Sequence, residues 1–366
     1  MSTIIQGAFA NPTVTTHHGG HIAISGCIYD SHKNKITLSE RFSGYFGDFY
    51  QTVNNHSIDI ESDVQFLSGR SIYLGHIMTH YGHFILETLS TFHPLIEDNA
   101  YDYFVFHAFD RQIDTHQLPQ FIVEAFQSFG ISLEKIIIVD RLLQFESLLV
   151  SKRLVKLNHS IQADMLDVYK HLSESLFIQN HNRENKRQLK LYLSRVKNSH
   201  KSINRAILNE IVIEELLKQR GFTIVYLESL SIRKQLEILN QAELIVGFSG
   251  SALHNCVFLR RSTQLIEFGD VRAGDKTHPM QKKCNELSQV NAKFVPFEGR
   301  VLYANKGIGL VNYKGLMNTV DTLLDKSKDE SSFVPVILHL KVGFIRGLVW
   351  CRVYFGSIKR FKSKSL

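Results

Sequence analysis

The chain has 366 residues, more than one ordinary hydrophobic core needs, so two domains are expected. Its composition, 44% hydrophobic and 21% charged, is typical of globular proteins and excludes a disordered chain. The net charge of +7 arises entirely from residues 331–366, which hold seven basic residues and no acidic one. A nucleic-acid enzyme needs a basic groove on its body, so this distribution argues against that class and against a nucleic-acid partner.

The cysteines and the apolar segments indicate the cellular compartment that we expect for the protein. The four cysteines are far apart and form no CxxC pair, which predicts neither a zinc site nor a disulfide framework. The N-terminus has no basic stretch followed by a long apolar segment, so no signal peptide is expected. No uncharged apolar run reaches the roughly 20 residues that a spanning helix requires. We therefore expect a cytoplasmic protein.

The first half of the chain predicts an α/β pattern from about residue 71 onward. Before it, short β-like runs such as 22–28 alternate with polar turns. Apolar runs at 103–107 and 135–139 are typical of buried strands, and residues 118–129 between them have helical spacing. A further helix is expected over 163–177.

In the second half, strands and helices alternate regularly. Strands are predicted over 189–193, 223–227, 244–246 and 264–268, with helices over 206–220 and 231–240. This alternation predicts a parallel, doubly wound sheet. The expected domains are 1–178 and 188–330, joined by a polar linker at 179–187 and followed by a basic tail at 331–366.

The most informative segment is the loop that follows the predicted strand at 244–246. In a parallel sheet, such a loop lies at the carboxyl edge, where ligands bind. Small residues let a phosphate approach the backbone, and the start of a helix favours an anion. An ordinary tight turn is the alternative. The candidate anion-binding residues are Ser249, Gly250, Ser251, Ala252, Leu253, His254 and Asn255.

Three charged residues near strand ends extend this candidate site. Glu267 ends the predicted strand at 264–268, where its carboxylate could accept hydrogen bonds from the hydroxyls of a ribose. Arg195, after the strand at 189–193, and Arg205 could bind a diphosphate through charge-assisted hydrogen bonds. The alternative for each of them is an ordinary solvated charge.

A candidate general base lies in the first half. His83 and Glu87 are one helical turn apart, and a transferase needs a base for the acceptor hydroxyl. His83 is preferred over Glu87, and a buried histidine without chemistry is the alternative. His76 and His80 would extend the same face toward a metal site, but Gly75 and Gly82 weaken a continuous helix, so no metal is expected.

Several known motifs are absent. The sequence contains no GxxxxGK[ST] loop, no early GxGxxG fingerprint and no HExxH. A nucleotide-sugar epimerase would need the dinucleotide fingerprint, which argues against that class. The absence of a D-x-D triplet favours metal-independent transfer without a cofactor.

Taken in order, these residues resemble glycosyltransferase family 61. The pattern includes the run at 192–195, Arg205, the pair at 209–210, the strand at 245–247, the loop at 250–255 and the pair at 266–267. The segment at 82–87 resembles the family's histidine-containing helix.

The resemblance implies a GT-B-like α/β fold, with two doubly wound Rossmann-like domains facing across a cleft. It implies that the domain at 1–178 is on the acceptor side and that the domain at 188–330 binds the nucleotide-sugar. It also implies inversion at the anomeric carbon, a UDP-sugar donor, and a glycan or lipid-linked acceptor in capsular or other surface polysaccharide synthesis. Ser249 departs from the family, which usually has histidine there; a serine can donate one hydrogen bond but supplies no positive charge. A non-catalytic glycan-binding or assembly protein on the same fold is the alternative function.

The tail at 333–366 combines aromatic and apolar residues with all seven excess basic residues. Trp and Tyr beside Lys and Arg suit the surface of an anionic membrane. This predicts peripheral attachment to the inner face of the cell membrane. A helix that crosses back to the N-terminal domain is the alternative.

Overall fold

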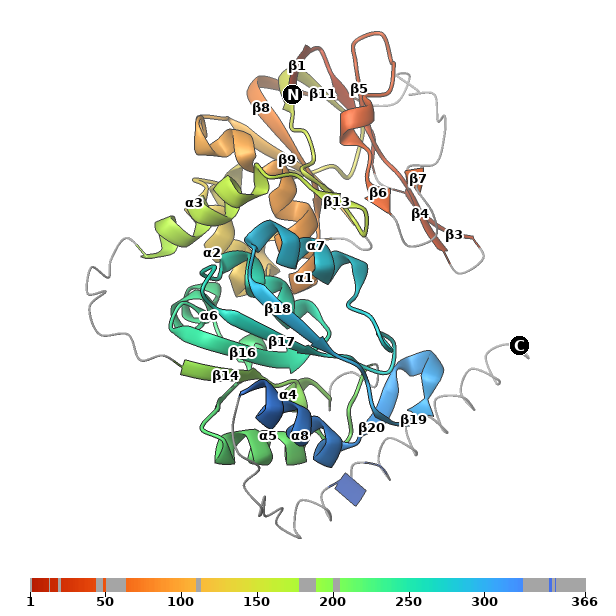
Figure 1. The fold of residues 1–366 in the computed structure, drawn as a ribbon. Coiled ribbons are helices and arrows are strands. Elements are labelled where there is room, and N and C mark those ends of the chain that lie inside the picture. The colour runs from red at the N-terminus through yellow and green to blue at the C-terminus, as the bar shows by residue number, and fades with distance from the viewer. Residues whose placement is uncertain are drawn as a thin grey trace. The chain divides into compact units, whose positions relative to one another are not determined.

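The computed structural model divides the chain into two compact units, shown in Figure 1. The first combines residues 1–185 with 231–237 and 279–289, and the second combines 186–230, 238–278 and 290–366. The structure describes residues 2–12, 14–18, 21–43, 49–50, 64–109, 113–177, 189–199, 205–324, 342–343 and 346. The predicted linker and nearly all of the basic tail lie outside these ranges.

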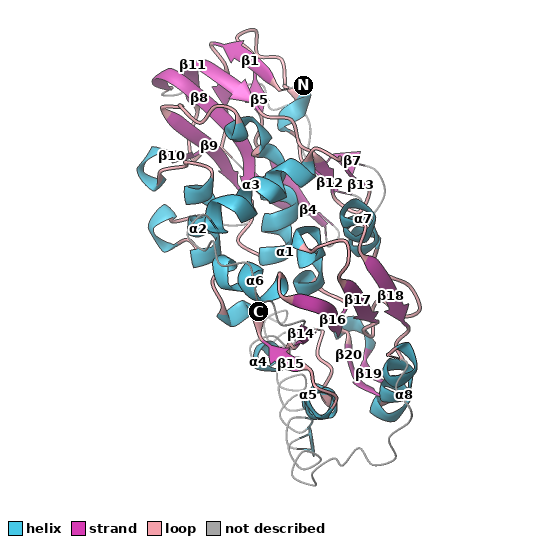
Figure 2. Ribbon diagram, turned by 60° about the vertical axis from the view of Figure 1, so that its left-hand side comes forward, coloured by secondary structure: helices cyan, strands magenta, loops and turns pink. Residues whose placement is uncertain are grey.

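The first unit contains a seven-stranded mixed sheet of order β10-β9-β8-β11-β2-β5, with β1 also paired to β11 (Figure 2). Its parallel part consists of β8 (Gln65–Ile77), β9 (Tyr103–Ala108), β10 (Ile136–Ile138) and β11 (Leu143–Val150). Its antiparallel pairings involve β1 (Thr3–Gln6), β2 (Phe9–Ala10) and β5 (Ile28–Tyr29).

Short helices follow β8 and supply an aromatic core. They are α1 (Tyr81–His83), a π-helix (Phe84–Thr88) and two 3-10 turns (Leu89–Thr91 and His93–Ile96). Together with α2 (Gln120–Ser128) and α3 (Met165–Phe177), they bury Phe84, Phe92, Phe106, Phe126 and Phe129. Because fully buried aromatic rings pack in few orientations, this core holds the chain after β8 in a defined position.

The second unit contains a five-stranded, fully parallel sheet of order β15-β14-β16-β17-β18. Its strands are β14 (Leu189–Leu193), β15 (Thr223–Val225), β16 (Ala242–Phe248), β17 (Gln264–Phe268) and β18 (Asn291–Val295). In chain order this is a 2-1-3-4-5 doubly wound sheet, whose connections change direction between β14 and β16. Ligands of such sheets bind at the carboxyl edge at that point.

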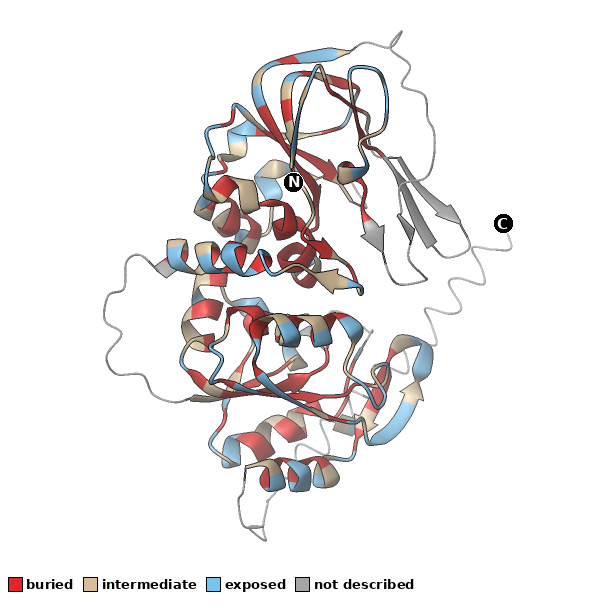
Figure 3. Cartoon of the chain, turned by 45° about the horizontal axis from the view of Figure 1, so that its top comes forward, coloured by how far each residue is buried: buried red, intermediate tan, exposed pale blue. Residues whose placement is uncertain are grey.

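One face of this sheet is covered by α5 (Glu210–Gln219) and α8 (Tyr313–Leu323). Their apolar side chains form one core with those of β14, β16 and β17, and these strands are almost entirely buried (Figure 3). Parallel strands buried on both faces have continuous apolar sequences. This explains why the predicted bounds of β14 and β17 are confirmed.

The remaining elements are short. The strands are β3 (Val14–His18), β4 (His21–Ser25), β6 (Phe42–Ser43), β7 (Phe49–Tyr50), β12 (Val155–Lys156), β13 (Ser160–Ile161), β19 (Gly299–Tyr303) and β20 (Ile308–Val311). The helices are α4 (Val196–Ser199), α6 (Ile232–Leu239) and α7 (Pro279–Ser288). The 3-10 turns are Thr37–Ser39, Thr115–Gln117, Leu133–Lys135, Leu227–Ser229, Ser251–Phe258 and Ala304–Lys306.

The helix predicted over 206–220 begins only at Glu210, so its first turn was predicted wrongly. Arg205 has a φ of +64° and donates its N–H to the carbonyl of Lys306, and Ile207 forms a parallel bridge with Gly309. These long-range bonds hold the residues before Glu210 outside the helix. Helical spacing could not reveal them.

The mixed α/β class is confirmed, with two sheets rich in parallel strands. The domain bounds and the arrangement of the domains across a cleft stay predictions. Across the ranges that the structure describes, no helix is long and apolar enough to cross a bilayer.

Candidate active site

His83 and Glu87 lie where the chain leaves β8 and turns into a helix. Two hydroxyls hold this helix against the end of β8: Thr88 Oγ1 donates to the carbonyl of His76 at 3.0 Å, and Thr91 Oγ1 donates to that of Leu74 at 2.8 Å. The His83 side chain is 34% exposed, whereas that of Glu87 is only 4% exposed. A partly exposed histidine thus contacts a buried carboxylate.

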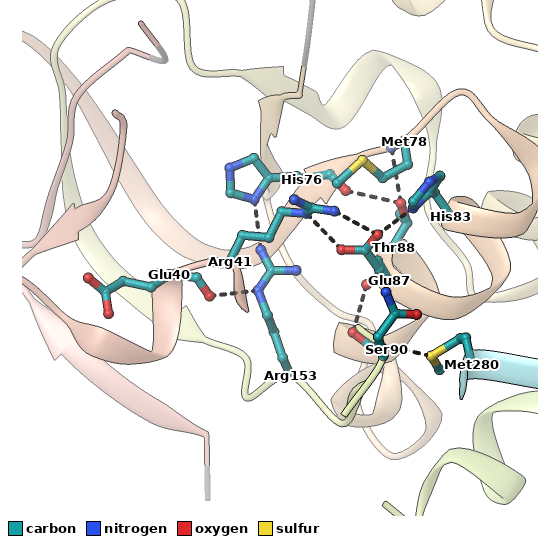
Figure 4. A network of polar contacts seen from close by, with 11 residues as sticks. Glu40, Arg41, His76, Met78, His83, Glu87, Thr88, Ser90, Arg153 and Met280 are labelled. Atoms are coloured by element: carbon teal, nitrogen blue, oxygen red, sulfur yellow. Dashed lines mark hydrogen bonds and ion pairs between the residues drawn. The ribbon is translucent and has the colours of Figure 1, made fainter. Parts of the chain in front are cut away.

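A buried ion pair holds Glu87 in its ionised form. Arg41 Nε and Nη2 donate to Glu87 Oε2 and Oε1 at 2.7 and 3.0 Å, and His83 Nδ1 lies 2.6 Å from Oε1 (Figure 4). Burial alone would raise the pKa of Glu87, but Arg41 and His83 together outweigh it and lower the pKa to about 2. An ionised carboxylate only accepts, so His83 Nδ1 must be the donor. The Nε2 atom of a neutral His83 is then left to accept a proton.

A second polar group lies beside this pair. Arg153 Nη2 donates to Nδ1 of His76 at 2.7 Å, and Arg153 Nε donates to the carbonyl of Glu40 at 3.1 Å (Figure 4). His76 belongs to β8, so it does not continue a helical face with His83. Among the described residues, no three His, Cys, Asp or Glu side chains come together in a group that could hold a metal ion.

In the second unit, Arg195 and the loop after β16 meet at the switch point of the parallel sheet. Arg195 follows β14, and its Nη1 donates to the carbonyl of Ser249 at 3.4 Å. A Cβ on Gly250 would lie 3.4 Å from the same Nη1 atom, which places the guanidinium directly beside the loop. The N–H groups of Gly250, Ser251 and Ala252 donate no hydrogen bond to any described residue. They begin the 3-10 helix Ser251–Phe258 and are available to an anion.

Ser249 and Glu267 form a buried pair at the same edge. The hydroxyl of Ser249 donates to Oε1 of Glu267 at 2.6 Å, and its N–H donates to the carbonyl of Phe268 at 2.8 Å. Oε2 of Glu267 is buried and accepts no hydrogen bond of ordinary geometry from the described residues. Burial raises the pKa of Glu267, although Ser249 and Thr277 partly offset this. The carboxylate therefore gains from any further donor that reaches Oε2.

Glu210 holds the chain at Arg195. Its Oε1 accepts the N–H of Arg195 at 2.8 Å and the hydroxyl of Tyr192 at 3.0 Å. Burial outweighs these contacts and raises the pKa of Glu210 to about 7. Glu210 therefore fixes the backbone just after β14, from which the side chain of Arg195 extends.

Replacing Glu210 by glutamine should stabilise the protein at alkaline pH. The folded pKa is about 7 and the ordinary value is 4.5, so between these values the folded state keeps a proton that the unfolded chain has lost. Stability therefore declines as the pH rises through this window. Glu210→Gln keeps an acceptor and cannot ionise, so thermal unfolding should show a larger gain in Tm over wild type near pH 8 than near pH 5. Equal gains at both would contradict the raised pKa.

The family model described as Glycosyltransferase 61 matches residues 81–266, half of the chain. The chain belongs to glycosyltransferase family 61. No curated protein matches the chain. The matched region of this family 61 glycosyltransferase begins two residues before His83 and ends one residue before Glu267.

The predicted site residues fall into two groups, one in each unit. His83 and Glu87 are in direct contact, and Arg195, Ser249, Gly250 and Glu267 form the second group. Within the loop, Leu253 and Asn255 are buried, and the side chain of Asn255 donates to the carbonyl of Ala252 at 3.1 Å. These two side chains therefore stabilise the conformation of the loop.

Two arginines of this glycosyltransferase, Arg41 and Arg272, were not predicted from the sequence as site residues. Arg41 precedes Glu87 by 46 positions in a segment without regular spacing, so no signal indicated their contact. Arg272 follows β17, and its side chain bonds to Asp270. The rule that selected Arg195, a cation just past the carboxyl end of a buried strand, could have found Arg272 as well.

Proposed function

We propose that this glycosyltransferase moves a sugar from a UDP-sugar to a hydroxyl of a glycan or lipid-linked acceptor in surface polysaccharide synthesis, with inversion. The observation that supports it most is the convergence of Arg195 with the loop at Ser249 and Gly250 at the switch point between β14 and β16. This is the place where doubly wound sheets bind nucleotides.

The donor would be held by its diphosphate and its ribose. Arg195 and the N–H groups of residues 250–252 face the diphosphate, and Arg205 adds a second cation. Glu267 Oε2 is buried and accepts no hydrogen bond of ordinary geometry from the described residues, so it would accept a hydrogen bond from a ribose hydroxyl. Ser249 would have to give up its bond to Glu267 before its hydroxyl could donate to a phosphate. Fixed donors of this kind stabilise the charge that develops on the leaving group, which supports metal-independent transfer.

His83 serves as the general base in this proposal. The acceptor oxygen forms a bond to the anomeric carbon while its proton passes to Nε2 of His83. The bond from that carbon to the phosphate oxygen breaks, and the nucleoside diphosphate leaves with the electron pair. Glu87, whose pKa is about 2, is too weak a base near neutral pH and instead orients His83 and stabilises its charged form.

A donor screen tests this function. The protein is heated with a panel of nucleotide sugars, and the compounds that raise Tm are then assayed for release of the nucleoside diphosphate, with and without glycan acceptors. A rise in Tm with donor-dependent release is expected for a transferase. Binding of glycans without any release would instead support the glycan-binding alternative, and no effect of any nucleotide sugar would reject the donor site.

The basic tail, nearly all of which lies outside the described residues, is proposed to bind anionic lipid at the inner face of the membrane. Cosedimentation with vesicles that contain anionic lipid should weaken as salt is added, because salt screens surface charges. The binding should disappear in a protein truncated after Ser332. Salt-independent binding would contradict the electrostatic attachment.

A further inference from the structure

The loop after β16 offers a diphosphate fewer hydrogen-bond donors than its sequence suggests. Both donors of Ser249 are engaged inside the protein: the hydroxyl bonds to Glu267 and the N–H bonds to Phe268. The backbone N–H groups of residues 250–252 and the Arg195 guanidinium remain as donors for a diphosphate. A nucleoside diphosphate carries several negative charges, so a further cation near this loop would strengthen its binding considerably.

The turn after β17 carries Arg272 at the same carboxyl edge of the sheet as that loop. β16 and β17 run in parallel register, with Phe248 opposite Phe268. The turn that follows is built on Asp270, which is 1% exposed. Its Oδ1 accepts the N–H groups of Arg272 and Ala273, both at 2.9 Å, and its Oδ2 accepts Arg272 Nη2 at 2.7 Å. Asp270 thus fixes both the backbone and one corner of the guanidinium.

The rest of the Arg272 side chain is held without using its remaining donors. A Cβ on Gly307, where φ is +64°, would lie 3.0 Å from both Cγ and Cδ of Arg272, so the stem lies against this glycine. Nε and Nη1 of Arg272 have no hydrogen-bond partner among the described residues, and the side chain is 37% exposed. The guanidinium is therefore positioned by one carboxylate oxygen and can bind an anion with its other edge.

Arg205 lies close to Arg272. The N–H of Arg205 bonds to the carbonyl of Lys306 at 2.7 Å, immediately before the glycine that supports Arg272. His278 lies within the field of both arginines: burial, then Arg272, then Arg205 lower its pKa. Two positive charges, those of Arg205 and Arg272, therefore act on the segment that follows β17.

We propose that Arg272 is a further diphosphate-binding residue of this glycosyltransferase, with Nε and Nη1 donating to phosphate oxygens of the donor. This inference rests on the proposed function, because it assumes a nucleotide-sugar at the carboxyl edge of the sheet. Asp270 acts as the positioning residue that presents the guanidinium.

Calorimetric titration of the full-length protein with UDP and with uridine tests the proposal. Arg272→Gln should weaken UDP binding by about 10- to 100-fold and leave uridine binding unchanged, because only UDP carries the diphosphate. Arg261→Gln is the matched control: it removes an exposed arginine from the turn before β17, at the opposite end of the same strand, and should change neither affinity.

The outcomes separate the two proposals. Equal UDP affinity in wild type and Arg272→Gln would overturn the role of Arg272 and leave the donor site intact. Absence of UDP binding by wild type, with every nucleotide sugar of the donor screen also inactive, would overturn both. If the glutamine variant does not fold, Arg272→Lys keeps the charge beside Asp270 but lacks a second edge of donors, so UDP should bind several-fold more weakly. Unchanged affinity in the lysine variant would also reject the inference.

Discussion

Replacing His83 by alanine is expected to lower kcat for sugar transfer by about 10²–10⁴-fold while changing donor binding little. The variant lacks the group that removes the proton of the acceptor hydroxyl, whereas the residues proposed to hold the donor belong to the second unit. The measurement is initial-rate kinetics with the donor and acceptor identified by the screen, together with titration of UDP. A loss in kcat with unchanged UDP affinity is the expected pattern.

Two further variants sharpen the test of His83. Glu87→Gln keeps the shape of the carboxylate but removes its charge, so it should lower kcat less than the alanine variant of His83 does. His116→Ala removes an exposed histidine from a surface turn of the same unit and serves as the control, with kcat close to that of wild type. If His83→Ala retained the kcat of the control, the assignment of the base would be wrong.

Arg195→Ala should lower kcat/KM for the donor by about 10²–10³-fold, because fixed donors at the leaving group stabilise the transition state more than the ground state. Arg195→Lys restores the charge without the planar fork and should recover only part of the loss. The measurement is donor-dependent release of UDP, with melting curves to verify that the variants fold.

The control for Arg195 is Arg261→Ala, which removes an exposed arginine near the amino end of β17 and should leave kcat/KM unchanged. Equal losses in both variants would show that net charge matters, and that the position at the switch point does not. Full activity in Arg195→Ala would contradict the proposed contact between Arg195 and the diphosphate.

The amino-acid sequence by itself determined the α/β class, the strands at 189–193 and 264–268, and the loop that follows β16. It also determined that His83 and Glu87 would meet, since residues four apart on a helix face each other. These features depend on local spacing and on continuous apolar runs, which a single sequence displays directly. Family membership followed from the same short motifs.

Only the tertiary structure decided which partners these residues use. The ion pair from Arg41 keeps Glu87 charged, Glu267 takes the hydroxyl of Ser249, and Arg272 is presented by Asp270. The late start of α5 at Glu210 belongs to the same class, because contacts with residues 306–309 override helical spacing. The physical reason is that buried polar groups must be satisfied by whichever groups the fold brings near, and that choice depends on packing between segments far apart in the chain.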